Sequence, residues 1–204
     1  MAQIPTRGIS QFKSKLIGGG ARNNLFEVDV TFPDGINLAV QGDGTGLFDR
    51  ENFRFLCKSS ALPASTVTPI AVPFRGRELK VAGDRSIASW TITVINDEDF
   101  SHRRAFEAWM QNIAQYADHS GLTEPGSYMG NAIVYQLGRS PSNQQAVNSV
   151  GDASRILAQY RFIDIFPTLI SDIQLSYDQA NAIEEFSVEF QVQYWFPEAP
   201  GTGA

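Results

Sequence analysis

The residues best suited to metal binding or nucleophilic catalysis are few in this sequence and lie far apart. His102 and His119 are the only histidines, and Cys57 is the only cysteine. Neither histidine has a cysteine or a second histidine at the spacing of a zinc site. Cys57 lies in FRFLCK, which is typical of a small buried strand residue, and a thiol nucleophile is the minor alternative. We therefore predict no metal site and no cofactor.

Other motifs that could do chemistry have simpler interpretations. Asp97, Glu98 and Asp99 could bind a cation, but they directly precede a helical pattern, which favours helix capping. The GDGTG run at 42–46 lacks the Lys-Ser/Thr and the helix of a phosphate-binding loop, so it indicates a flexible loop. No serine lies in a nucleophile elbow, and no carboxylates converge as an acid–base pair. The sequence therefore predicts no catalytic residue and a protein that is not an enzyme.

Charge is unevenly distributed along the 204 residues, whose net charge is −6. The first 26 residues carry bases and no acid: Arg7, Lys13, Lys15 and Arg22. The last 43 carry acids and no base: Asp164, Asp172, Asp178, Glu184, Glu185, Glu189 and Glu198. The two ends should attract one another, within a subunit or between subunits, although independent solvated charges are an equal alternative.

The elements that must position these residues are mostly strands. Large apolar residues alternate with polar ones in FSVEFQVQYWF at 186–196 and again at 26–32, which predicts strands with one apolar and one polar face. The same signals predict strands at 53–58, 88–95, 132–137, 157–166 (ended by Pro167) and 173–177, and an edge strand or crossover at 67–74. We expect a mainly β protein, an antiparallel barrel or sandwich of seven or eight strands.

One helix should flank this sheet at 101–118. Its apolar stripe is Phe106, Trp109, Met110 and Ile113, and it should cover the barrel as a lid. Residues 1–23 should form an N-terminal arm, 24–204 a single domain, 33–50 a long loop and 138–155 a surface loop. No segment has the length and apolarity of a membrane span or a signal peptide, so we expect no membrane partner and folding in the cytosol.

Several segments together resemble the tail tube proteins of contractile-tailed bacteriophages. They are KLIGGGARNNLFEVDVTFP (15–33), FLCKSSALP (55–63), FRGRELKVAGDR (74–85), WTITVIND (90–97), FEAWM (106–110) and FPTLISDIQLSYDQANAIEEFSVEFQVQYW (166–195). The resemblance covers most of the chain in the family's order, and the main departure is the loop at 138–155.

The resemblance implies a structural virion protein of the tail, assembled in the host cytoplasm. Hexameric rings would stack head to tail into a tube inside the sheath, and viral DNA would pass through the lumen without specific binding. Further partners would be the sheath, baseplate and tail terminator proteins. Polar strand positions would line the lumen: Glu27, Asp29, Thr31, Glu189, Gln191 and Gln193. The arm and the 33–50 loop would join rings through Arg7, Phe12, Lys13, Lys15, Arg22, Leu47 and Phe48.

Two alternatives stay open at this point. The first is the tube of a contractile injection or secretion system, which resembles this family in fold and passes proteins. The second is a closed β-barrel that binds a small ligand, which predicts a monomer with an apolar, concave pocket. Electron microscopy of the purified protein separates assembly from a monomer.

Overall fold

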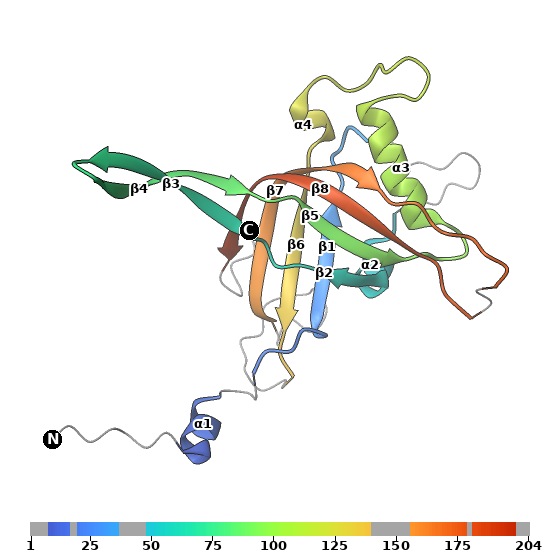
Figure 1. Ribbon diagram of the computed structural model, residues 1–204. Coiled ribbons are helices and arrows are strands. Elements are labelled where there is room, and N and C mark those ends of the chain that lie inside the picture. Colours follow the sequence, from blue (N-terminus) through green and yellow to red (C-terminus); the bar gives the residue numbers. More distant parts are fainter. Residues whose placement is uncertain (1–7, 17–19, 37–47, 140–155, 179–180, 199–204) are drawn as a thin grey trace.

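The computed structural model describes residues 8–16, 20–36, 48–139, 156–178 and 181–198 (Figure 1). Arg7, Leu47, the GDGTG run and most of the 138–155 loop, for which the sequence made predictions, lie outside these residues. The elements are α1 (Ile9–Lys15), β1 (Phe26–Thr31), α2 (Arg50–Leu56), β2 (Cys57–Ser60), β3 (Ser65–Phe74), β4 (Arg77–Ile87), β5 (Trp90–Ile95), α3 (Ser101–Ile113), α4 (Pro125–Tyr128), β6 (Gly130–Leu137), β7 (Ile156–Ile170) and β8 (Glu185–Glu198).

Six of the strands form one antiparallel sheet in the order β1-β6-β7-β8-β5-β2. The sheet curls into a nearly closed barrel, so that its two terminal strands, β1 and β2, approach each other beside α2 (Figure 1). The mainly β, antiparallel class predicted from the alternating strands is confirmed. Three shorter helices, α1, α2 and α4, accompany the predicted one.

The barrel interior is filled by the inward residues of these strands and by aromatic rings. Trp90 on β5 stacks on Phe162 on β7 with ring centroids 4.5 Å apart, and Phe190 on β8 lies 5.4 Å from the same tryptophan. Both phenylalanines are almost fully buried. Each such ring contributes about 1.5–3 kcal/mol through removal from water, so the interior is a packed core.

Helix α3 closes one end of the barrel. Phe106 and Trp109 are fully buried, whereas Met110 and Ile113 are half-buried. The Trp109 indole Nε1–H donates to the Tyr128 carbonyl at 2.7 Å, which ties α3 to α4. The helix ends at Ile113, five residues before the predicted end at 118, because the chain folds back on it.

Glycine is required at that fold-back. The Leu122 N–H donates to the Asn112 carbonyl at 2.9 Å. A Cβ at Gly121 would lie 2.0 Å from the Ile113 carbonyl oxygen, a distance that no side chain tolerates. The last turn of α3 is therefore bonded to the returning chain instead of continuing.

The acidic run before α3 bonds to backbone. The Asp97 carboxylate accepts from the Glu98 N–H at 2.8 Å, and the Asp99 carboxylate accepts from the Ser101 N–H at 2.9 Å. The Ser101 hydrogen bond lowers the pKa of Asp99. These contacts agree with the capping interpretation, although the residue at the N-cap itself is Phe100, in the left-handed conformation.

The predicted strand at 53–58 is wrong for its first half. Asp49 accepts hydrogen bonds from the Glu51 and Asn52 amides and starts helix α2, which runs to Leu56. Phe53 is fully buried while Phe55 is 82% exposed. Residues two apart share one face of a strand but lie on opposite sides of a helix. Only Cys57–Ser60 is extended, as β2.

Two predictions near the C-terminus are also wrong. Strand β7 passes Pro167 and ends at Ile170, because a register shift between Pro167 and Leu169 accommodates the missing N–H at a bulge. Residues 171–176 form no strand, contrary to the prediction for 173–177. Leu175 in this segment is 79% exposed, so the alternation of apolar residues at 173–177 does not mark a buried face of the sheet.

Candidate assembly surfaces

Strands β3 and β4 form a separate two-stranded hairpin that projects from the barrel (Figure 1). Its two-residue turn, Arg75 and Gly76, has positive φ at both positions, as type I′ hairpins require. The sequence predicted an edge strand or crossover at 67–74 and missed β4, because a hairpin exposed on both faces shows no clean alternation.

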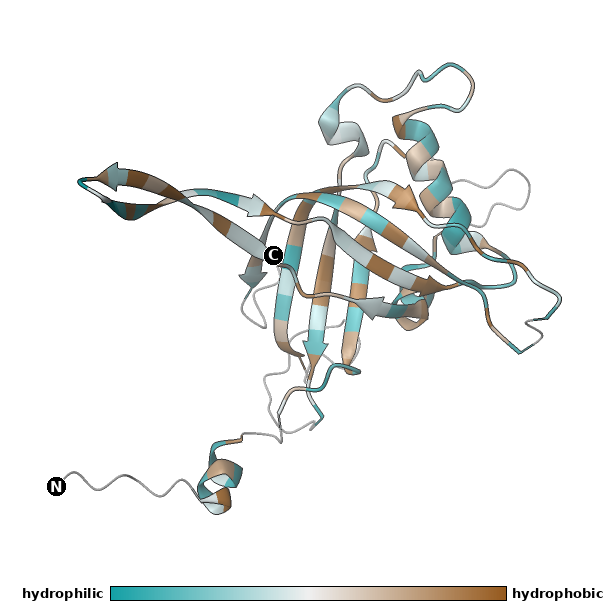
Figure 2. Cartoon of the chain, viewed as in Figure 1, coloured by the Kyte–Doolittle hydropathy of each residue, from teal (hydrophilic) through white to brown (hydrophobic). Residues whose placement is uncertain are grey.

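Hydrophobic residues occur along both strands of the hairpin (Figure 2), and their side chains are exposed to solvent. Every residue of β3 is exposed, prolines and β-branched residues included. The large exposed apolar residues are Val67, Ile70, Val72, Phe74, Leu79 and Val81. A two-stranded hairpin is marginal alone in water, and a contiguous apolar patch of this kind marks an interaction surface.

The N-terminal arm contains helix α1, which lies away from the barrel and buries none of its residues (Figure 1). Ile9 and Phe12 are 76% and 64% exposed, and Leu16 continues the same stripe one turn on. Lys13 and Lys15 are exposed in its last turn, and Arg22 is exposed between α1 and β1. A seven-residue helix is marginal without packing, so the arm presents an apolar stripe and positive charge together.

Phe48 was predicted to contact a neighbouring ring, but it packs within its own subunit. Its ring centroid lies 4.4 Å from that of Phe32 and 5.0 Å from that of Phe53. The Phe48 side chain therefore packs against the core of its own subunit, at the end of the 33–50 loop.

The polar face of the terminal strands is divided between open and covered positions. Thr31, Gln191 and Gln193 are exposed, and Glu27 and Glu189 are half-buried. Asp29 is only 4% exposed although it points to the same face as Glu27 and Thr31. The period of two thus sets which face each side chain occupies, while neighbouring elements decide how much water reaches it.

Asp29 is covered by two arginines of α2. Arg50 donates to both carboxylate oxygens, at 3.0 Å from Nε and 2.8 Å from Nη2, and Arg54 donates at 2.5 Å. The arginines are four residues apart, so they lie on one side of the helix. The sequence prediction placed Arg50 in the 33–50 loop and Arg54 in a strand, so it did not bring the two arginines together.

A second ion pair lies on the same outer face of the barrel. Arg161 on β7 donates to Glu198 on β8 at 3.1 Å, and the Gln159 amide donates to the same carboxylate at 2.6 Å. Tyr135 lies beside these groups on β6, and burial raises its pKa. This face therefore carries arginines whose charge is already paired.

Two of the three chemically capable side chains, Cys57 and His102, are buried, whereas His119 is exposed. Cys57 is 6% exposed, as predicted, and burial raises its pKa to about 12, so the thiol stays protonated. His102 is 1% exposed between the rings of Phe48 and Phe53, and burial lowers its pKa. Within the part of the chain that the structure describes, no His, Cys, Asp and Glu cluster could hold a metal ion.

A barrel with a packed interior and projecting apolar segments is typical of a structural protein that assembles through its surface. The chain belongs to the phage tail tube protein family, whose match spans residues 21–198. It is 32% identical over 178 residues to tail tube protein gp19 of Enterobacteria phage T4, covering 87% of this chain and 92% of that protein. Tail tube protein gp19 of Enterobacteria phage T6 is 31% identical over the same shares. The protein is thus a component of the virion tail.

Solved structures share the fold at low sequence identity. A chain of the anti-feeding prophage baseplate has a TM-score of 0.56 at 11% identity, covering 89% of this chain and 97% of that one. A chain of the anti-feeding prophage tube-terminating cap has a TM-score of 0.54 at 13% identity, covering 88% of this chain and 91% of that one.

None of the helices that the structure describes has the length and apolarity to cross a membrane.

Proposed function

We propose that this chain forms hexameric rings that stack head to tail into the inner tube of a contractile tail, the conduit for viral DNA. The family match supports the tube, and the anti-feeding prophage baseplate that shares the fold was symmetrised six-fold. The observation that carries self-assembly is hairpin β3–β4, whose apolar side chains find no cover in their own subunit.

Neighbouring subunits in a ring contact each other through this hairpin and through the barrel edge. The hairpin projects far enough from the barrel to lie on an adjacent copy (Figure 1). Strand β1 pairs only with β6 among the described strands, and α2 and β2 approach its other edge without pairing with it. Edge-to-edge contact between copies would remove exposed edges, as closure of a barrel does.

The polar face that carries Glu27, Thr31, Glu189, Gln191 and Gln193 lines much of the lumen, with Asp29 beneath it. Free lysines or arginines in a lumen would exchange counterions with DNA phosphates and hold them. On this face Arg54 is paired with Asp29, and Arg161 with Glu198. DNA would therefore pass without specific binding.

Rings join through the arm, with Phe12, Lys13, Lys15 and Arg22 at the contact and Arg7 and Leu47 completing it. The ends of the tube meet baseplate and terminator proteins, and its outside meets the sheath, in the virion tail assembled in the host cytoplasm. Baseplate and cap structures of the anti-feeding prophage contain chains of this fold, which supports these partners.

Two other functions are weaker. A tube of a contractile injection or secretion system would share this fold, but the curated relatives at 32% and 31% identity are phage proteins. A ligand-binding barrel would have a hollow apolar interior, whereas Trp90, Phe162 and Phe190 fill this one.

Sedimentation and negative-stain microscopy of the full chain test the proposal. We expect rings or tubes that form with increasing concentration, and we expect Val72→Lys in the exposed hairpin to abolish them. Gln111→Lys, on the exposed side of α3, is the matched control and should assemble normally. A monomer at every concentration would overturn the proposal.

A further inference from the structure

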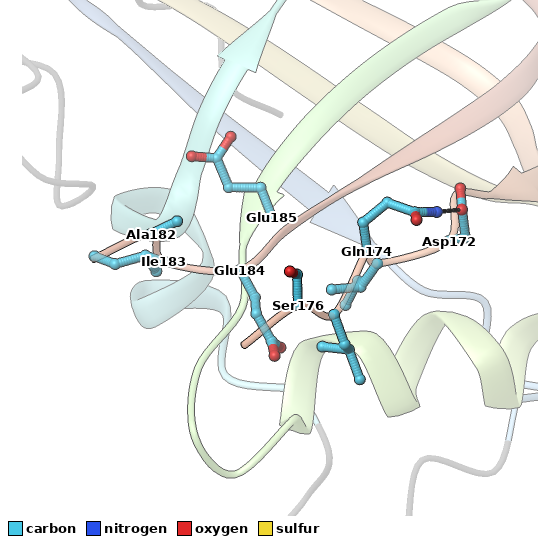
Figure 3. Close-up of a pocket in the computed structure, with 9 residues that line it drawn as sticks. Asp172, Gln174, Ser176, Ala182, Ile183, Glu184 and Glu185 are labelled. Atoms are coloured by element: carbon cyan, nitrogen blue, oxygen red, sulfur yellow. Dashed lines mark hydrogen bonds between the residues drawn. The ribbon is translucent and has the colours of Figure 1, made fainter. Parts of the chain in front are cut away.

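The connection between β7 and β8 forms a pocket of about 410 Å³ at the surface of the barrel. Its two limbs, residues 172–176 and 182–185, face each other across it (Figure 3). The side chains of Leu175 and Ile183 line this pocket and are 79% and 72% exposed. Their own subunit gives them no apolar cover.

The pocket is acidic as well as apolar at its rim. Asp172, Glu184 and Glu185 line it, and Figure 3 shows Glu184 and Glu185 leaving the chain in opposite directions. Glu185 is paired with Lys58 at 2.5 Å, and Glu184 accepts from the Asn96 amide at 3.0 Å. Asp172 is exposed, and among the described residues its carboxylate accepts a hydrogen bond only from the neutral Gln174 amide. An incoming cation would meet uncompensated negative charge here.

Helix α1 has the complementary surface. Its stripe of Ile9, Phe12 and Leu16 is apolar and exposed, and Lys13 and Lys15 flank that stripe. An amphipathic helix that buries such a stripe in a groove is a recurrent mode of recognition. The acidic pocket with Leu175 and Ile183 at its rim matches both the apolar and the charged side of α1.

The two surfaces lie at opposite ends of the same strands. Strand β1 follows the arm, and its first residue, Phe26, pairs with Gln136 near the end of β6. Gln136 in turn pairs with Ala158 near the start of β7, so the arm enters the barrel at the end where β7 begins. The pocket follows the far end of β7, at Ile170. A donor at one end and an acceptor at the other is the arrangement that head-to-tail stacking requires.

Distance keeps α1 from the pocket of its own subunit. From Ala158 to Ile170 the strand spans about 40 Å at about 3.3 Å per residue. The chain between Leu16 and Phe26 reaches at most about 35 Å, so α1 would approach this pocket only with that segment fully extended, and in the structure α1 points away from the barrel (Figure 1). A second copy is therefore the better source of the occupant.

We infer that α1 of one subunit docks in the pocket between residues 172–176 and 182–185 of a subunit in the next ring. Phe12 packs against Leu175 and Ile183, and Lys13 and Lys15 lie near Asp172 and Glu184. This inference rests on the proposed stacking of rings and names the contact that joins them.

A cysteine pair tests the contact directly. Phe12→Cys together with Ile183→Cys should give disulfide-linked ladders under oxidation in assembled tubes, and no ladder in dilute, dissociated subunits. Cys57 does not compete, because it is buried and its pKa is raised to about 12. Phe12→Cys with Tyr116→Cys, on an exposed side chain outside the pocket, is the control and should give no ladder.

A charge exchange gives a second readout. Lys13→Glu with Lys15→Glu should shorten tubes to single rings or short stacks. Asp172→Lys with Glu184→Lys, at the two acidic positions of the proposed contact, should do the same, and combining both pairs should restore length. Normal tubes without a ladder would overturn the docking while leaving the tube intact. Failure of the unmodified chain to form rings would overturn the proposed function itself.

Discussion

Asp29 on β1 accepts a hydrogen bond from Arg54 on α2, 25 residues along the chain. The contact lies where the two terminal strands of the sheet approach, so it joins the edges of the barrel through a charged pair. Asp29 is 4% exposed, and a buried charge is tolerated only with such partners.

Removing the Asp29 carboxylate should therefore be costly. Asp29→Ala leaves Arg54, whose side chain is only 16% exposed, without its counter-charge, and we expect a loss of about 3–5 kcal/mol in the free energy of unfolding, measured by urea denaturation of dissociated subunits. Arg50→Ala is the matched control, because the Arg50 side chain is 53% exposed and exposed pairs contribute about 0–1 kcal/mol. Equal effects of the two variants would contradict this assignment.

Trp109→Ala should create a cavity under α3. Trp109 is fully buried and donates to the Tyr128 carbonyl, so the expected loss is about 3–5 kcal/mol, seen as a lower melting temperature. Gln111→Ala, on the exposed side of the same helix, should change the melting temperature little. An unchanged melting temperature for Trp109→Ala would show that the helix is not packed as a lid.

His102 should make the subunit less stable in acid. Burial lowers its folded-state pKa below the usual 6.5, so between the two values the unfolded chain binds more protons than the folded one. Stability contributed by the neutral imidazole is complete above about pH 6.5 and is lost as pH falls toward the folded pKa. His102→Leu should flatten the change in melting temperature between about pH 7 and 5, whereas His119→Gln, at an exposed position, should not. Identical slopes in all three proteins would argue against it.

Deleting residues 1–20 should leave folded subunits that form single rings and no long tubes. Helix α1, the described helix of the arm, has no buried residue, so the melting temperature of the subunit should stay the same. Raising salt from about 0.1 to 1 M shortens the Debye length from about 10 to 3 Å and should weaken ring stacking in the full chain, measured as tube length by negative stain. Long tubes from the truncated chain would show that the arm does not join rings.

The sheet could be predicted from sequence because half-buried strands keep a period of two. Glu189, Gln191 and Gln193 alternate with Val188, Phe190 and Val192 in the structure as in the pattern. Helix α2 could not be found this way, since Phe53, Phe55 and Cys57 also alternate. The Asp49 cap was the available signal, and the exposed Phe55 shows that a large apolar side chain in this segment need not face the core.

The candidate surfaces were predictable only in part. The sequence shows basic residues in the arm and acidic residues in the C-terminal third. Contact between these two groups depends on where in the barrel strand β1 begins and strand β7 ends. The burial of Asp29 was not predictable, because Arg50 and Arg54 reach it through tertiary packing. Ile173, Leu175 and Tyr177 alternate in a pattern that predicted a strand at 173–177, although residues 171–176 form none.

Cryo-electron microscopy of the assembled full chain tests the central claim most directly. We predict stacked six-fold rings, with Thr31, Gln191 and Gln193 facing a continuous lumen and hairpin β3–β4 covered by an adjacent copy. Rings of another symmetry, or a lumen lined by Phe190 and Val192 from the present core, would contradict the account.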